Sequence, residues 1–269
     1  GDPRGPSWGL NQYGLLLGHG LIRPLRPDDL ERIEEAFAAA TRRAFDWGFD
    51  AVEVHLGHGY LLSQWLSPLF HPRPLEERLE WPLRVLQRVR AEARGPVIAK
   101  TNLEDGVRGG LGRDEALLIA QAIEGHVDAI LPSAGLVQRN AMHLLRGRAP
   151  LPDLVAVEKH PLQKLALRAF GPFVLRDSDF TPGFLQPAAE ALRAAVTLPL
   201  ILVGGVESKA AIQGAMDAGF DFVAMGRALL SDPDFVERLA AGEDVVARCD
   251  RCNRCMAEMD RDGVRCVLP

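Results

Sequence analysis

Short apolar runs alternate with longer amphipathic stretches along most of the chain. The first amphipathic stretch begins at Pro27-Asp28-Asp29, places apolar residues three or four positions apart as far as Ala44, and stops at Gly48. This spacing predicts a helix, and the run at 50–55 that follows it predicts a strand. The same order recurs four more times, with helices at about 83–93, 114–124, 187–196 and 208–219 followed by strands at 96–100, 127–131, 200–203 and 221–225.

This repeated order predicts an α/β fold with a parallel sheet covered by helices, because short strands rich in Val, Ile and Leu are buried on both faces of such sheets. A closed (β/α)8 TIM barrel requires eight strands, and five are visible here. A chain of 269 residues that is 47% hydrophobic can bury one sizeable core. The stretch 132–187 shows few clear elements and has prolines at 150, 152, 161, 172 and 182, and we expect it to contain an active-site excursion.

Composition excludes several classes of function. The net charge of −5 is spread without long runs, so there is no basic stripe of the kind that nucleic-acid binding requires. No apolar stretch reaches the length of about 18 residues that a membrane span needs, and the first residues show no signal-peptide pattern. We therefore expect a cytoplasmic protein that acts on a small-molecule substrate.

Two glycine turns suggest a phosphate site. Gly204 and Gly205 follow the strand at 200–203, and Gly226 and Arg227 follow the strand at 221–225. A glycine between a strand and a helix lets the backbone approach an anion, and the N–H groups of the following helix face it. Arg227 would add a forked cationic donor. Consecutive turns of this kind on the last two strands are typical of the phosphate site of a (β/α)8 barrel.

The strongest chemical cluster follows the first predicted strand, where His55, His58 and Tyr60 fall within six residues. Imidazole N–H groups can bind a carbonyl oxygen or an oxyanion, and a phenol can give a proton to the carbon beside that carbonyl. The alternative is a turn whose rings only satisfy loop carbonyls. The position at the carboxyl end of a barrel strand favours the functional interpretation.

The segment 48–68, with its His-Leu-Gly-His-Gly-Tyr core, resembles the signature of the old yellow enzyme superfamily, the NADH:flavin oxidoreductases. Further landmarks agree in order: Lys100 ends the next strand, the Gly204-Gly205 turn follows later, and the stretch 225–230 precedes Asp-Pro at 232–233. The resemblance runs from about residue 5 to the end of the chain and implies a barrel that binds FMN.

The resemblance also implies roles for individual residues. His55 and His58 would hold the oxygen of the acceptor, and Tyr60 would protonate its α-carbon. Lys100 would stand beside the flavin pyrimidine edge, where a cation stabilises negative charge on the reduced ring; the alternative is a solvated lysine at the rim. The residues that would bind the FMN phosphate are Gly204, Gly205, Gly226 and Arg227, although Arg227 could instead form a structural ion pair.

The sequence departs from the family in two places. Family members begin with three more βα units, whereas this chain opens in what resembles the loop after the third strand. A short insert of the Asp-x-Tyr-Gly-Gly type is also missing between Arg73 and Pro74. We interpret both absences as omitted parts of a longer molecule. We expect residues 1–248 to form the FMN-binding barrel domain and residues 249–269 a separate cysteine-rich segment.

This last segment holds all four cysteines, Cys249, Cys252, Cys255 and Cys266. Closely spaced thiols in an intracellular enzyme indicate metal binding before disulfides. Four thiolates suit a [4Fe-4S] cluster or a tetrahedral zinc ion, and spacing does not separate these from free thiols. The segment resembles the cluster-binding part of the dienoyl-CoA reductase and trimethylamine dehydrogenase branch, in which a further domain supplies electrons. Here the resemblance implies an external electron donor.

The sequence is compatible with three functions. The leading hypothesis is an FMN-dependent oxidoreductase that uses NAD(P)H, either NADH or NADPH, to reduce a carbonyl-conjugated alkene, that is, an ene reductase. The second is a lyase or aldolase on a phosphorylated substrate, with Lys100 as a Schiff-base lysine. The third is a non-catalytic subunit, if the first three strands are absent from the mature protein. We expect a homo-oligomer of unspecified size.

Overall fold

The computed structural model describes residues 3–10, 20–261 and 263–269, and the chain divides into two compact units. The first unit comprises Gly1–Leu136 with Ala188–Ile201, and the second comprises Val137–Pro187 with Leu202–Pro269. The cysteine-rich segment thus clusters with other parts of the second unit. The expected division at residue 248 stays a prediction.

A parallel sheet forms the centre of the first unit. Its strands are β4 (Val52–Leu56), β5 (Val97–Asn102) and β6 (Ala129–Ser133), in the order β4-β5-β6. All residues of β6 are buried, as expected for a strand covered on both faces. The register pairs His55 with Lys100, so the carboxyl ends of β4 and β5 lie at the same edge of the sheet. The predicted α/β fold is confirmed in this unit.

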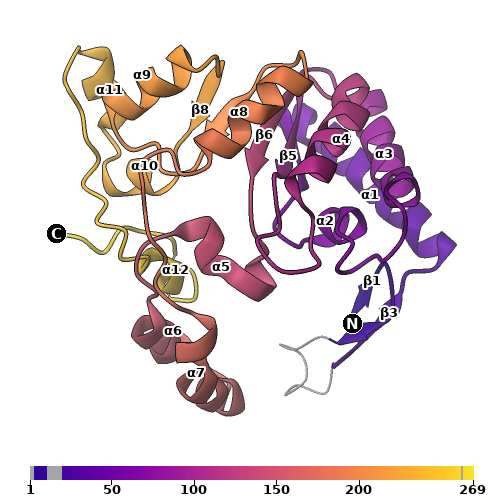
Figure 1. The fold of residues 1–269 in the computed structure, drawn as a ribbon, viewed down its shortest axis with the longest axis horizontal. Coiled ribbons are helices and arrows are strands. Elements are labelled where there is room, and N and C mark those ends of the chain that lie inside the picture. The colour runs from indigo at the N-terminus through magenta and orange to yellow at the C-terminus, as the bar shows by residue number, and fades with distance from the viewer. Residues whose placement is uncertain (1–2, 11–19, 262) are drawn as a thin grey trace. The chain divides into compact units, whose positions relative to one another are not determined.

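Helices pack beside this sheet, as Figure 1 shows for α1, α3 and α4. The positive φ of 88° at Gly48 ends α1, because a left-handed residue after a helix favours glycine. Gly95 lets the chain enter β5, since a Cβ there would lie 2.3 Å from the carbonyl oxygen of Asp50. The helical elements are α1 (Pro27–Asp46), α2 (Leu61–Leu66), α3 (Leu75–Glu92), α4 (Arg113–Ile123), η2 (Glu124–His126) and α8 (Gln186–Ala195), of which α8 has its last eight residues in this unit.

A small sheet precedes α1. It contains β1 (Arg4–Gly5), β2 (Gly9–Leu10) and β3 (Leu21–Pro24), with β3 parallel to β1 and antiparallel to β2. The sequence pattern does not predict these strands, because two of them are only two residues long.

The second unit has a two-stranded sheet of β7 (Ile201–Val203) and β8 (Phe222–Ala224). Phe235 and Val245 are fully buried beside it in a cluster with Ala228 and Ala247. The helices are α5 (Val137–Leu145), α6 (Leu151–Val157), α7 (Pro161–Val174), α9 (Lys209–Asp217), α10 (Arg227–Ser231), α11 (Phe235–Ala240) and α12 (Cys255–Glu258).

The expectation of few elements in 132–187 is wrong, because α5, α6 and α7 lie there. The prolines of this stretch are compatible with helices, because Pro150 precedes α6, while Pro152 and Pro161 occupy first-turn positions. Proline is well suited to a first turn, where its missing N–H has no helical partner to lose. Among the described helices, none is long and apolar enough to cross a membrane.

Candidate active site and cysteine cavity

The first unit brings together the predicted His55, His58, Tyr60 and Lys100. The ring centroid of His55 lies 4.9 Å from that of His58 and 5.1 Å from that of Tyr60. His55 is on β4 and faces Lys100 of β5 across the sheet register. The carboxyl edge of the parallel sheet therefore carries two imidazoles, a phenol and an ammonium group.

The turn after β4 places His58 in an uncommon backbone conformation. Its φ is +62°, in the left-handed region, where most side chains are disfavoured and His, Asn and Asp are enriched. The backbone N–H of His58 donates to Asn102 Oδ1 at 3.1 Å. Gly57 allows this approach, because a Cβ at residue 57 would lie 2.8 Å from the same oxygen.

Asn102 is fixed in turn by buried partners. Its Nδ2 donates to Asp105 Oδ1 and to the carbonyl of Gly135, each at 2.9 Å. Asp105 Oδ2 accepts from Ser67 Oγ at 2.6 Å. Sequence reasoning missed these residues; the one available signal was the position of Asn102 at the end of a strand, two residues after Lys100.

The ring of His58 has a hydrogen-bond partner that the sequence did not indicate. Its Nε2 lies 2.7 Å from Ser133 Oγ at the carboxyl end of β6. His58 is 7% exposed and Ser133 is 1% exposed. Burial, with smaller contributions from the nearby charges of His55 and Lys100, lowers the pKa of His58 to about 3. The ring is therefore neutral at physiological pH and has one N–H to donate.

His55 and Lys100 form the more open part of the cluster. Burial and the charge of Lys100 lower the pKa of His55, so its neutral form is also favoured. Lys100 Nζ lies 3.9 Å from Glu53 Oε1. Tyr60 precedes α2 and is 53% exposed, which leaves its phenol accessible to a small molecule.

The two predicted phosphate turns lie in the second unit, after its paired strands. Gly204 and Gly205 both have positive φ, at 103° and 77°. A Cβ on Gly205 would lie 2.9 Å from the backbone oxygen of Thr181, so side-chain space at this turn is taken by the segment 181–185. At Gly226 a Cβ would meet no atom within 4 Å, and that turn is open.

Arg227 binds oxygens of the second unit itself. Its guanidinium donates to the carbonyl oxygens of Leu145 and Arg146 and, at 2.5 Å, to Asn253 Oδ1. Arg227 therefore connects α5 to the C-terminal segment. Its predicted role as a phosphate ligand stays a prediction, because these oxygens occupy its forked donors.

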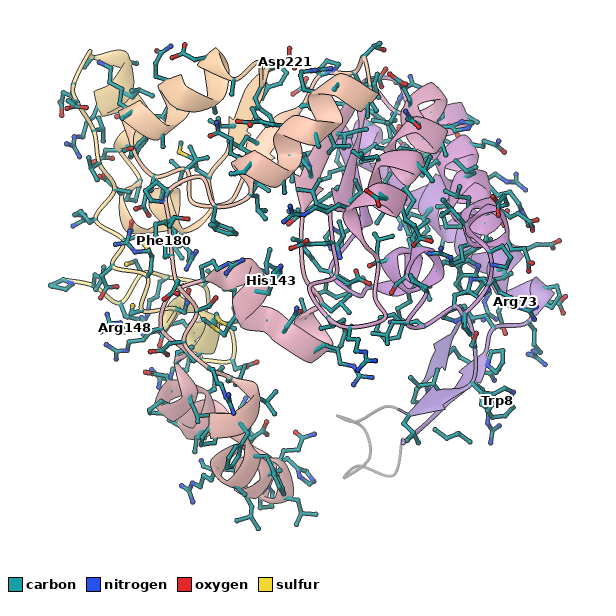
Figure 2. All side chains as sticks on the ribbon, viewed as in Figure 1. Trp8, Arg73, His143, Arg148, Phe180 and Asp221 are labelled. Atoms are coloured by element: carbon teal, nitrogen blue, oxygen red, sulfur yellow. The ribbon has the colours of Figure 1, made fainter. Side chains whose placement is uncertain are left out.

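The four cysteines line one small cavity of about 20 Å³. Burial raises the pKa of Cys252, and also that of Cys255, against which the charge of Arg227 acts in the opposite direction. Within the described ranges, no group of three or more His, Cys, Asp or Glu side chains is arranged to hold a metal ion. Phe180, labelled in Figure 2, stacks under the guanidinium of Arg251 at 4.4 Å and so contacts this segment.

Comparison with known proteins relates part of the chain to a known family. The model of the NADH:flavin oxidoreductase / NADH oxidase family matches residues 19–143. A 4,4'-dithiodibutanoate disulfide reductase from Rhodococcus erythropolis is 40% identical over 259 residues, covering 93% of this chain and 64% of the relative. Residues 19–143 belong to the NADH:flavin oxidoreductase / NADH oxidase family. The resemblance inferred from the segment 48–68 is confirmed.

Two solved structures share the fold of this chain. A 2-naphthoyl-CoA reductase has a TM-score of 0.72 at 21% identity, covering 98% of this chain and 37% of the reductase chain. An old yellow enzyme homologue from Zymomonas mobilis has a TM-score of 0.62 at 18% identity, covering 94% of this chain and 64% of the homologue. The chain thus spans between about one third and two thirds of the length of these proteins.

Proposed function

We propose that this NADH:flavin oxidoreductase-family chain is part of an FMN-dependent enzyme that uses NAD(P)H to reduce a carbonyl-conjugated alkene. The observation that carries the proposal is the cluster of His55, His58, Tyr60 and Lys100 at the carboxyl edge of the parallel sheet. It combines two neutral donors for an oxygen, an accessible acid and a cation. These are the groups that reduction of an activated alkene requires.

The residues of the second unit fit the phosphate of FMN in part. The open turn at Gly226 leaves room for an anion, and Gly204 and Gly205 supply left-handed backbone of the kind that forms anion-binding turns. Arg227 would have to release a carbonyl to contact the phosphate. We therefore propose Gly226 as the main phosphate contact, with Gly204, Gly205 and Arg227 as further candidates.

The mechanism follows from the chemistry of the cluster. Bound FMN supplies hydride transfer from NAD(P)H to the β-carbon of the alkene. His55 and His58 donate hydrogen bonds to the carbonyl oxygen and stabilise the negative charge that develops on it. Tyr60 gives its phenolic proton to the α-carbon, and solvent reprotonates it because the side chain is exposed. Lys100 holds a positive charge near both imidazoles.

The test separates the two half-reactions of the FMN-loaded enzyme. Tyr60→Phe keeps the ring and removes the acid, so reduction of the flavin by NAD(P)H should proceed at the wild-type rate. Reoxidation by cyclohexenone should slow by about 10²- to 10⁴-fold in stopped-flow measurements. Lys159→Met removes an exposed charge in the second unit and serves as a control for general effects. Normal reoxidation of the Tyr60→Phe enzyme would contradict the assigned role.

A second candidate substrate is an organic disulfide. It is favoured by the 40% identity to a reductase named for 4,4'-dithiodibutanoate. Two electrons and two protons convert a disulfide to two thiols, and the same histidines and tyrosine could bind and protonate a thiolate. Steady-state rates with cyclohexenone and with 4,4'-dithiodibutanoate, measured on one preparation, decide which acceptor class the enzyme prefers.

We also propose that Cys249, Cys252, Cys255 and Cys266 bind a metal centre, either a [4Fe-4S] cluster or zinc. Their common cavity supports the proposal, although the thiols would have to move to converge. Iron, sulfide and zinc analysis of anaerobically purified protein distinguishes the two metals from free thiols. Cys255→Ser should reduce the metal content, and a wild-type protein without metal would overturn the proposal.

We also propose that the whole protein forms a (β/α)8 barrel. It is supported by the parallel order β4-β5-β6 and by the old yellow enzyme homologue among the solved structures. An experimental structure of the whole protein with FMN would test it.

A further inference from the structure

We propose that Ser133 is a positioning residue that sets the ring tautomer of His58 by donating its hydroxyl hydrogen to Nε2, so that Nδ1 carries the proton. The consequence for acceptor binding rests on the proposed function. The choice between the two tautomers rests on it as well, but the tautomer itself can be measured without turnover.

The hydrogen-bond partner of His58 Nε2 is a buried serine hydroxyl. Ser133 Oγ lies 2.7 Å from Nε2, and both side chains are buried, so bulk water does not compete for this contact. The backbone of His58 is held separately, by the N–H donated to Asn102. Ser133 therefore acts on the ring and Asn102 on the main chain, and the two can be varied independently.

A neutral imidazole has one N–H and one bare nitrogen, and a serine hydroxyl can donate to the bare one or accept from the other. The low pKa of His58 excludes the form with both nitrogens protonated. If Nε2 carried the proton, Nδ1 would present a lone pair to the acceptor oxygen and repel it. Donation from Ser133 to Nε2 is the arrangement that leaves an N–H for the oxygen.

The strand ends offer a matched control. Thr101 lies on β5 and is 2% exposed, and among the described residues its Oγ1 has no hydrogen-bond partner. Thr101→Val removes a buried hydroxyl of similar environment without touching His58. Ser133→Ala removes the hydroxyl that contacts His58, and Ser133→Thr keeps a hydroxyl at the same position.

The experiment records NMR spectra of the FMN-loaded enzyme with isotope-labelled histidine, and His58→Asn identifies the signals of His58. We expect the proton on Nδ1 in the wild type, in Ser133→Thr and in Thr101→Val, and a shift towards Nε2 in Ser133→Ala. The dissociation constant of cyclohexenone should rise about tenfold in Ser133→Ala alone, as for the loss of one hydrogen bond.

The outcomes separate the two proposals. A proton on Nε2 in the wild type, or an unchanged tautomer in Ser133→Ala, overturns the role of Ser133. A tautomer shift in Ser133→Ala without any change in cyclohexenone binding supports the role of Ser133. That same result would contradict the proposed contact between His58 and the acceptor oxygen.

Discussion

The buried ring of His58 links the stability of the protein to pH. Burial lowers the pKa of His58 from its ordinary value of 6.5 to about 3. Between these values the unfolded chain binds a proton that the folded chain does not, so the free energy of unfolding decreases as the pH falls from about 6.5 towards 3. Above about pH 6.5 both states are neutral at this residue and its contribution no longer changes.

His58→Asn should remove this dependence, because asparagine does not titrate and tolerates positive φ. Between pH 7 and pH 5 the wild type should lose about 2 kcal/mol more unfolding free energy than the variant. Urea titrations at both pH values measure the difference. His55 and His71 also have lowered pKa values, but the wild type and the variant both contain them, so their contributions cancel in the comparison. Equal losses in the two proteins would show that residue 58 is not neutralised by burial.

Lys100 should influence the potential of bound flavin. If its ammonium group lies beside the reduced ring, Lys100→Met removes a favourable charge interaction and makes the flavin harder to reduce. The midpoint potential should fall by on the order of 20–90 mV, which corresponds to about 1–4 kcal/mol for a two-electron couple. Spectroelectrochemistry measures the potential, with Lys159→Met as the control. A midpoint potential equal to or above that of the wild type would show that the ammonium group of Lys100 does not lie beside the flavin ring.

At this scale the sequence predicted the candidate reactive side chains but not the groups that hold them. The sequence motif identified His55, His58 and Tyr60. Asn102 and Ser133 were missed because an amide or hydroxyl at a strand end has no periodic signature. Their contacts with His58 depend on the register of three parallel strands, which the sequence order alone does not specify.

At the scale of elements, two glycines that precede strands differ in what they contact. A Cβ on Gly95 would lie 2.3 Å from the carbonyl oxygen of Asp50, whereas a Cβ on Gly125 would meet nothing within 4 Å. Gly95→Ala should therefore cost about 1–3 kcal/mol of unfolding free energy through overpacking, and Gly125→Ala should change it by less than about 0.5 kcal/mol. Thermal and urea unfolding of the two variants test this. Similar changes in unfolding free energy for the two variants would mean that the backbone before β5 shifts to make room for the added methyl group.

Helices with regular apolar spacing were predictable, and those that depend on packing were less so. The predicted helix from Pro27 to Gly48 agrees with α1, and the helix predicted at 208–219 agrees with α9, where Ser208 is the N-cap and its Oγ accepts from the N–H of Ala211 at 3.1 Å. The helix predicted at 83–93 instead begins at Leu75 and continues through Pro82. Burial of Trp81 and Val85 on either side of this proline stabilises the helix across it.

At the scale of the whole molecule, Asn253 connects segments that are distant in sequence. Its Nδ2 donates to the carbonyls of Arg146 at 2.8 Å and Arg148 at 2.9 Å, and its Oδ1 accepts from Arg227. Because Asn253 has φ of +58°, glycine keeps the backbone and removes only these bonds.

Asn253→Gly should loosen the C-terminal segment, since it removes the hydrogen bonds to the carbonyls of Arg146 and Arg148 and from Arg227, each worth about 0.5–1.5 kcal/mol. Limited proteolysis followed by mass spectrometry should show faster cleavage within 249–269 than in the wild type. Arg254→Ala, which breaks a half-exposed ion pair with Asp153, is the control and should have little effect. Equal cleavage in all three proteins would show that other contacts hold the segment.

The hydrogen bond from Asn253 to Arg146 joins residues that lie 107 positions apart in the chain, so the ribosome makes its two partners at different times. The second unit is interrupted by residues of the first and receives its last partners from the C-terminal segment. At about 5–20 residues per second, on the order of 5–20 s pass between translation of Arg146 and translation of Asn253. Throughout that interval α5 lacks at least one of the two side chains that bind its end, Arg227 and Asn253, so we expect the nascent second unit to stay open and available to chaperones until translation has passed residue 253.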